Sequence, residues 1–250
     1  NGKNYTEALA DVAKGNETVE YACGIPQMSQ GNILKVSRQV TCEDRRDPLG
    51  VVASIVPFNF PFMVPMWTLP IALVTGNTIV LKPSEKVPLT MNRTIELLTE
   101  AGVPKGVVNI VNGSKDAVDS LIEHEDVRAV TFVGSSPIAQ IVKSKCDRLH
   151  KRCTALGGAK NHLIALPDCD LEETSRDVVV SAFGCAGQRC MAASVLLIVG
   201  EGEMQQKLLS KIIDKASQLE PGTCPGKMGP VIDKRSLEKI VGYIDNSESI

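Results

Sequence analysis

Residues 50–56 read Gly50-Val51-Val52-Ala53-Ser54-Ile55-Val56, a short and mostly apolar run that stops at Pro57. A continuous apolar run of this length predicts a strand that is covered on both faces of a sheet. Runs of the same character follow at residues 78–82, 107–111, 129–133, 162–166 and 195–199. The chain is therefore expected to build its core around buried, parallel strands.

Helical patterns separate these runs. Apolar residues recur at helical spacing, and helices are predicted at residues 87–98, 138–149, 178–182 and 204–219. Strands that alternate with helices are typical of βαβ units. We therefore predict an α/β fold with a parallel sheet.

Two domains are expected. The first covers residues 1–156, with a helical lead-in followed by βαβ units over residues 50–156. The second, over residues 157–250, is part of another α/β domain. The length of the chain allows either one large domain or two ordinary ones.

The composition excludes several classes of protein. A net charge of −2 and an aromatic content of 4% argue against a nucleic-acid-binding surface. The most apolar stretch, residues 63–74, contains Pro65 and Pro70 and is too short to cross a bilayer, so a soluble protein is expected. The 8 cysteines lack the spacing of a zinc site, so we expect no metal, a reducing compartment and free thiols.

Residues 183–191, Phe-Gly-Cys-Ala-Gly-Gln-Arg-Cys-Met, hold the main candidate for chemistry. Cys190 follows Arg189 directly, in a run of small residues that lets a ligand approach the backbone. A thiol is a useful nucleophile when its thiolate is stabilised, and a neighbouring cation does this. The segment favours a catalytic Cys190; the alternative is a buried structural cysteine.

Polar residues follow three of the predicted strands. The amide of Asn59 can donate hydrogen bonds to a developing oxyanion, or Asn59 can be a simple turn residue. Lys82 and Glu85 can hold a ribose, or belong to a capped helix start. Ser135 opens a helix whose N-terminus suits a phosphate, although a Gly-x-Gly-x-x-Gly fingerprint is absent from the chain.

Five short motifs follow one another along the chain: Pro-Phe-Asn-Phe-Pro at 57–61, Lys-Pro-Ser-Glu at 82–85, Phe-Val-Gly-Ser at 132–135, Gly-Gly-Ala-Lys-Asn-His at 157–162 and Gly-Gln-Arg-Cys at 187–190. This order resembles the aldehyde dehydrogenase superfamily over essentially the whole chain. The resemblance is greatest to the coenzyme A-acylating methylmalonate-semialdehyde dehydrogenases, through residues 56–67 and 159–162. Members are longer, so the chain would match a middle piece.

The resemblance implies a variant Rossmann-type, dinucleotide-binding domain over residues 1–156 and a partial catalytic domain over residues 157–250. Cys190 would be the nucleophile, with Asn59 and the Cys190 N–H as the oxyanion hole. Arg189 would attract the carboxylate of the substrate, unless it serves packing or thiolate stabilisation. Val56 and Phe58 would line the nicotinamide side of the NAD site. Lys82 and Glu85 would hold the adenosine ribose, with Lys86 nearby, and Ser135 would contact the pyrophosphate.

One departure from the superfamily bears on the reaction. Hydrolytic members carry a glutamate where this chain has Ala155 or Leu156, and that glutamate activates water against the acyl-enzyme. Without it, coenzyme A is the expected acceptor of the acyl group. One alternative is that another residue activates water, which would make the enzyme a hydrolytic NAD(P)-dependent aldehyde dehydrogenase that releases a free acid. The other alternative is a non-catalytic fragment.

The resemblance also implies the setting of the reaction. The substrate would be a small, carboxylated semialdehyde in valine or thymine catabolism. Glu85 would disfavour the 2′-phosphate of NADP, which makes NAD the expected cofactor. The full enzyme would be a homo-oligomer, a tetramer or a dimer, without nucleic-acid or membrane partners. It would be cytoplasmic in a bacterium and lie in the mitochondrial matrix of a eukaryote.

Overall fold

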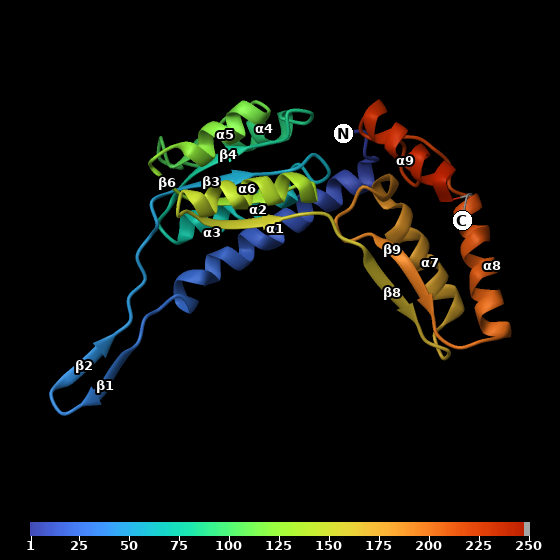
Figure 1. The fold of residues 1–250 in the computed structure, drawn as a ribbon, viewed down its shortest axis with the longest axis horizontal. Helices are drawn as coiled ribbons and strands as arrows, with labels where there is room; N and C mark the ends of the chain where they lie inside the picture. The colour runs from blue at the N-terminus through green and yellow to red at the C-terminus, as the bar shows by residue number, and fades with distance from the viewer. Residues whose placement is uncertain (248–250) are drawn as a thin grey trace. The chain divides into compact units, whose positions relative to one another are not determined.

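The computed structural model describes residues 1–247, which form two compact units (Figure 1). The sheet unit comprises residues 10–157. The cysteine unit comprises residues 1–9 and 158–250, of which residues 248–250 lie outside the description. The division at residue 157 falls next to the boundary expected from the sequence, but the first nine residues group with the C-terminal part.

A parallel five-stranded sheet forms the centre of the sheet unit, in the order β5-β4-β3-β6-β7. Its strands are β3 (Val51–Ile55), β4 (Thr78–Lys82), β5 (Val108–Ile110), β6 (Val127–Val133) and β7 (Arg152–Leu156). The first strand of this sheet in chain order, β3, lies in the middle, and the chain then adds β4 and β5 on one side of it and β6 and β7 on the other. This order confirms the α/β fold with a parallel sheet.

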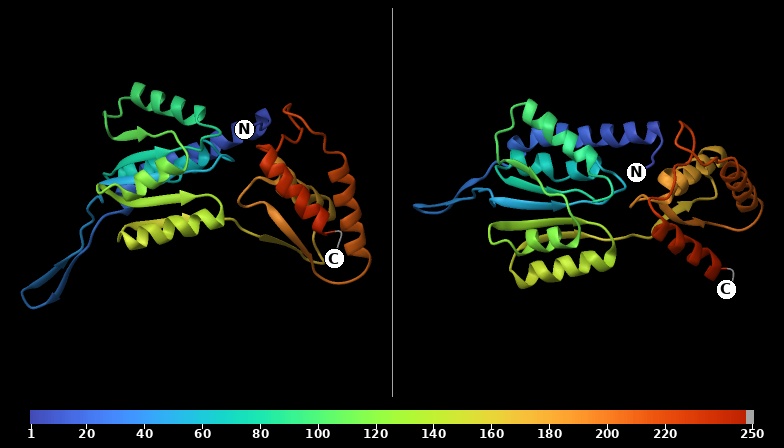
Figure 2. Two further views of the ribbon diagram at one scale, coloured as in Figure 1. Left: turned by 45° about the horizontal axis from the view of Figure 1, so that its top comes forward. Right: turned by 90° about the horizontal axis from the view of Figure 1, so that it is seen from above.

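Helices cover both faces of this sheet (Figure 2). On one face α5 (Lys115–Glu123) packs on β3 and β6, and α6 (Ser136–Arg148) packs on β6 and β7. On the other face α2 (Met63–Met66), α3 (Leu69–Val74) and α4 (Leu89–Glu100) enclose a second apolar cluster. Successive strand residues point to opposite faces, so only a strand that is apolar throughout supplies both cores. The largely apolar runs in the sequence meet that requirement, and the one buried hydroxyl of β3, on Ser54, forms a hydrogen bond with the Thr68 hydroxyl.

The N-terminal lead-in is only partly helical. Helix α1 spans Tyr5–Met28, and it is followed by an antiparallel hairpin of β1 (Ile33–Ser37) and β2 (Val40–Glu43). The expectation of a helical lead-in is therefore wrong for the hairpin. Its β-branched residues favour strands, and Gln39, with φ of 63°, makes the tight turn between them.

The cysteine unit contains a parallel pair, β8 (Asn161–Ala165) and β9 (Ala193–Ile198). Helix α7 (Leu171–Phe183) packs on β9 and on α8 (Glu203–Ser217), as Figure 1 shows, and α9 is Lys234–Ser247. A short 3₁₀ turn, η1 (Gly184–Gly187), leads from α7 toward β9. Over residues 1–247, no helix has the length and apolar character needed to cross a membrane.

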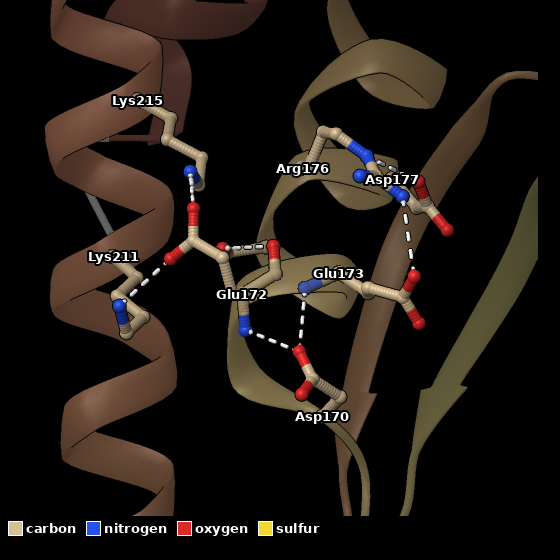
Figure 3. A network of polar contacts seen from close by, with 8 residues as sticks. Asp170, Glu172, Glu173, Arg176, Asp177, Lys211 and Lys215 are labelled. Carbon is tan, nitrogen blue, oxygen red and sulfur yellow. Dashed lines mark hydrogen bonds and ion pairs between the residues drawn. The ribbon is translucent and has the colours of Figure 1, made fainter.

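The start of α7 is fixed by charged side chains (Figure 3). The Asp170 carboxylate accepts hydrogen bonds from the N–H groups of Glu172 and Glu173 at 2.9 and 2.8 Å, which satisfies two donors of the first turn. The Glu172 carboxylate in turn accepts from Lys211, at 2.8 Å, and from Lys215, both on α8. These two lysines lower the pKa of Glu172 to about 2.

The stability of the protein should depend on this carboxylate in a pH-dependent way. Because the pKa of Glu172 is lowered from its ordinary value of 4.5, its ion pairs stabilise the fold above that value, and the contribution fades as the pH falls toward 2. We expect Glu172→Gln to lower the urea midpoint of unfolding at pH 7, with the difference from the wild type vanishing as the pH approaches 2.

Glu173→Gln is the matched control for this measurement. Glu173 lies in the same first turn of α7 and feels the same helix dipole, but its carboxylate is 3.8 Å from Arg176 and does not reach α8 in Figure 3. Its midpoint should stay close to the wild type at all pH values. An equal loss for both variants would mean that the dipole, and not the lysines, accounts for the effect.

Candidate active site

The carboxyl ends of β3, β4 and β6 lie side by side along one edge of the sheet, because the three strands are adjacent and parallel. This edge is the usual place of ligand binding in open α/β sheets, especially where the chain reverses the direction in which strands are added. The reversal occurs here between β3 and β6. The loops that leave these three strands carry all the residues that the sequence proposes for NAD.

Lys82 is the last residue of β4 and lies almost fully inside the protein. Its side chain is 5% exposed, and its Nζ lies 3.4 Å from the Oε2 atom of Glu85, a side chain that is 51% exposed. A buried ammonium group needs a nearby acceptor, and Glu85 supplies one at the surface. The N–H of Val56, at the end of β3, donates to the Lys82 carbonyl at 3.1 Å, which ties the two strand ends together.

The loop after β3 places Phe58 beside the loop after β4. The Lys86 Nζ lies over the Phe58 ring, 5.6 Å from its centroid, within the range of a cation–π contact. Asn59 is the next residue and is half-buried. The structure therefore brings Val56, Phe58, Lys82, Glu85 and Lys86 together at the ends of β3 and β4.

Ser135 occupies the N-terminal cap position of α6, after β6. Its backbone is extended, with φ of −73° and ψ of 146°, and its carbonyl accepts the Ala139 N–H at 2.9 Å. Pro137 lies in the first turn, where a missing N–H costs no helical hydrogen bond. The side chain of Ser135 is exposed. The N–H groups of the first turn of α6 therefore lie next to the same sheet edge.

Cys190 lies in the turn that joins η1 to β9, and it is half-buried. Asn161, the first residue of β8, holds this turn from the side of the neighbouring strand. Its Nδ2 atom donates to the carbonyls of Cys190 and Ala192, at 2.9 and 3.0 Å. Two hydrogen bonds from one amide fix the direction of the backbone on both sides of Met191. The position of Cys190 is thus set by the β8–β9 pair.

The Arg189 guanidinium has other partners than those expected from the sequence. It was expected beside the Cys190 thiol or facing a substrate, but its three nitrogens donate within the cysteine unit: Nη2 to Glu7 Oε1 at 3.0 Å, Nη1 to the Val180 carbonyl at 3.4 Å, and Nε to Cys185 Sγ at 3.5 Å. A buried carboxylate attracts the guanidinium more strongly than a thiol does. The geometry supports the alternative in which Arg189 serves packing.

Burial separates the thiols of the chain by reactivity. Burial raises the pKa of the Cys185 thiol, and the hydrogen bond from Arg189 opposes this rise only in part. Burial, with contact from Cys153, raises the pKa of Cys146 to about 12, and burial raises the pKa of Cys153 as well. A thiol with a raised pKa is mostly protonated at neutral pH and a poor nucleophile. Within the segment 183–191, Cys185 is therefore a poor candidate for the nucleophile.

Two contributors to this site were not identified from the sequence. Asn161 stands in a recognised motif, but its role needed the pairing of β8 with β9 to become visible. Glu7 carries no local signal, because its partners Cys185 and Arg189 are remote in the sequence. Asn59 and Cys190 belong to different units, so the oxyanion hole expected from them stays a prediction.

Comparison with known proteins shows the family of the chain. The aldehyde dehydrogenase family matches residues 1–249. The chain is 47% identical to malonate-semialdehyde dehydrogenase 1 of Geobacillus kaustophilus over 98% of its own length and 50% of that protein. The chain therefore spans about half the length of the curated relatives that it matches.

Solved structures give the same picture. The structure of methylmalonate-semialdehyde dehydrogenase from Oceanimonas doudoroffii is 44% identical, with a TM-score of 0.95 over 99% of this chain and 51% of that one. An NAD⁺ complex of aldehyde dehydrogenase from Bacillus cereus is 31% identical, with a TM-score of 0.94 over 100% of this chain and 51% of that one.

Proposed function

Because the chain belongs to the aldehyde dehydrogenase family, we propose that it forms part of an enzyme that oxidises a small carboxylated semialdehyde with NAD and passes the acyl group to coenzyme A. The observation that carries the proposal is that one chain contains both a half-buried Cys190, held in its turn by Asn161, and a sheet edge that suits a dinucleotide. Malonate and methylmalonate semialdehyde are the proposed substrates, after the names of the relatives.

The residues at the sheet edge fit NAD by their chemistry. The ammonium of Lys82 and the carboxylate of Glu85 offer a donor and an acceptor 3.4 Å apart, which suits the two hydroxyl groups of a ribose. The first turn of α6, after Ser135, offers backbone N–H groups to a pyrophosphate. Val56 and Phe58 supply an apolar wall. A carboxylate at position 85 repels a 2′-phosphate, which favours NAD over NADP.

In the proposed mechanism Cys190 first attacks the aldehyde and later leaves as the acyl group passes to coenzyme A. Its thiolate attacks the aldehyde carbon, and Asn59 with the Cys190 N–H stabilises the oxyanion of the thiohemiacetal. NAD, held by the residues of the sheet edge, would supply the hydride acceptor for this oxidation, and Cys190 would then carry the acyl group as a thioester. The thiol of coenzyme A then attacks this thioester and releases the Cys190 thiolate. For a malonate-type substrate the bond to the carboxylate breaks, carbon dioxide leaves, and the alpha carbon takes up a proton from solvent, which gives acetyl-CoA from malonate semialdehyde and propionyl-CoA from methylmalonate semialdehyde.

The end of β7 supports transfer to coenzyme A over hydrolysis. Ala155 and Leu156 pair with Phe132 and Val133 of β6 and have no ionisable side chain. A water molecule at this place would find no base there. The thioester is therefore proposed to wait for a stronger nucleophile.

Dependence on coenzyme A tests this proposal. In a full-length enzyme that includes this chain, we expect one burst of NADH from malonate semialdehyde without coenzyme A, followed by turnover below roughly a tenth of the rate with it, since the acyl-enzyme then limits the reaction. Mass spectrometry should identify acetyl-CoA as the product. Undiminished turnover without coenzyme A, with a free acid as the product, would instead establish a hydrolytic enzyme.

The setting of the enzyme follows from the same proposal. We infer a homo-oligomer for the full-length protein, located in the cytoplasm of a bacterium or in the matrix of a mitochondrion. Its proposed place is the breakdown of valine or thymine, where such semialdehydes arise.

A further inference from the structure

Glu7, in the first turn of α1, holds both ends of the segment that precedes Cys190. Its Oε1 atom accepts a hydrogen bond from the Cys185 N–H at 2.7 Å and another from Arg189 Nη2 at 3.0 Å. Its side chain is only 15% exposed, so solvent screens these contacts weakly. A single carboxylate oxygen thus connects the beginning and the end of one short turn. All three residues belong to the cysteine unit.

The turn that Glu7 holds has an unfavourable backbone. Cys185 has φ and ψ of 52° and 32°, and Ala186 has 54° and 38°, so two consecutive residues with side chains adopt the left-handed conformation. Such residues persist only where their surroundings fix them, and they are frequent at functional sites. The hydrogen bond from Glu7 reaches the N–H of the first of them. Glu7 therefore opposes relaxation of the turn at its strained residue.

Arg189 transmits this restraint to Cys190. A side chain at Gly184 would meet the Arg189 guanidinium at 2.3 Å, so the guanidinium lies directly against the glycine backbone. The Val180 carbonyl and the Cys185 sulfur accept from its two other nitrogens. Because the guanidinium is held on all three nitrogens, the backbone of Arg189 has a defined direction, and Cys190 is the next residue.

The N-terminus of α1 is itself fastened where Glu7 lies. The Asn4 Oδ1 atom accepts from the Glu7 N–H at 2.9 Å, and its Nδ2 atom donates to the Lys227 carbonyl at 2.8 Å. Asn4 is buried, at 6% exposure. Glu7 is therefore presented to the turn from a fixed backbone and does not rely on a mobile chain end.

From these contacts we propose that Glu7 is a positioning residue for the Cys190 nucleophile, acting through the Cys185 N–H and Arg189. Asn161 fixes the chain after Cys190, and Glu7 fixes the chain before it. The proposal depends on the proposed function in that Cys190 is the nucleophile there. Without Glu7 the strained turn is free to relax and the Arg189 charge loses its partner, so the thiol and N–H of Cys190 move from the position that the reaction needs.

The test compares Glu7→Ala, Glu7→Gln and the control Glu20→Gln in a full-length enzyme. Displacement of a reacting group by about 1 Å costs up to about 10²-fold, so we expect kcat to fall by about 10- to 10²-fold for Glu7→Ala. Glu7→Gln keeps an oxygen for the Cys185 N–H and should lose less. Glu20 is exposed on the same helix, and its variant should match the wild type. The KM for NAD should stay within about twofold, since Glu7 lies outside the sheet unit.

Alkylation of Cys190 by iodoacetamide, followed by peptide mass spectrometry, supplies the second measurement. In the folded Glu7→Ala protein the rate constant for Cys190 should change, while that for the exposed Cys224 stays constant. The double variant Glu7→Ala/Arg189→Ala should be no worse than the poorer single variant, because both changes break one linkage. The proposal would be overturned if Glu7→Ala had the same kcat and the same rate of Cys190 alkylation as the wild type. It would also be overturned if kcat fell only in proportion to the amount of folded protein that was lost.

The activity and alkylation measurements distinguish a failure of the proposed reaction from a failure of the proposed role of Glu7. If the proposed reaction is wrong, Cys190→Ala will retain activity, yet the alkylation rate of Cys190 will still report whether Glu7 positions it. If only the role of Glu7 is wrong, Cys190→Ala will abolish activity and Glu7→Ala will leave the alkylation rate unchanged.

Discussion

Replacing Cys190 with alanine in a full-length enzyme should lower kcat for NADH formation by about 10³-fold or more, because removal of the nucleophile removes the covalent route and not one of several aids to it. The burst of NADH expected without coenzyme A should vanish as well, since no acyl-enzyme can form. Binding of NAD should persist, because its proposed residues lie in the sheet unit. Stopped-flow absorbance at 340 nm and fluorescence titration with NAD measure the two effects.

Cys224→Ala is the control for this result. Cys224 is exposed, and its replacement by alanine removes a thiol without opening a cavity, so activity should stay at the wild-type level. A Cys190→Ala enzyme that still reduces NAD with semialdehyde at an appreciable rate would mean that another group attacks the aldehyde. The mechanism proposed above would then be wrong, although membership of the family would stand.

Replacing Asn59 with alanine should lower kcat by about 10²–10³-fold, the usual cost of removing one donor from an oxyanion hole. Asn59→Asp should be at least as impaired, since a carboxylate repels the oxyanion that the amide stabilises. KM should change less than kcat, because the lost hydrogen bond is strongest in the transition state. Steady-state kinetics with saturating NAD give both constants.

Two controls separate an oxyanion role from a loss of structure. Asn109→Ala removes an exposed asparagine on β5, distant in sequence from the proposed site, and should leave kcat unchanged. The alkylation rate of Cys190 should also be unaltered in Asn59→Ala, because the amide acts on the substrate oxygen and not on the thiol. A kcat within about threefold of the wild type would exclude Asn59 from the oxyanion hole, given the range for single donors.

The sequence predicts those parts of the fold whose signal is local. The central strand β4 coincides with its predicted run, because its middle residues Ile79, Val80 and Leu81 face the two covered sides of the sheet and are all apolar. Strand β7, Arg152–Leu156, was not predicted. It lies at the edge of the sheet with alternate residues exposed, so its sequence mixes charged, polar and apolar residues. The hairpin of β1 and β2 is exposed throughout and leaves no pattern of burial to read.

Some residues of the candidate site could also be placed from the sequence, and others could not. Lys82 and Ser135 could be placed from the sequence, because a residue that follows a parallel strand must lie at its carboxyl end. The partners of Arg189 could not, since Glu7 is joined to it only by the folded chain. The adjacency of Arg189 and Cys190 suggests a direct electrostatic contact, whereas the competition among three acceptors directs the guanidinium elsewhere.

The grouping of residues 1–9 with residues 158–250 has a consequence for synthesis on the ribosome. The segment that contains Glu7 emerges before the sheet unit, but its partners emerge only after the whole sheet unit has been translated. The sheet unit is continuous in sequence and can fold as it appears, in the usual order for multidomain chains. The cysteine unit must instead close a long loop, whose entropy cost is reduced once the intervening chain is compact. The turn before Cys190 is therefore expected to acquire its final geometry late, after the rest of this chain has folded.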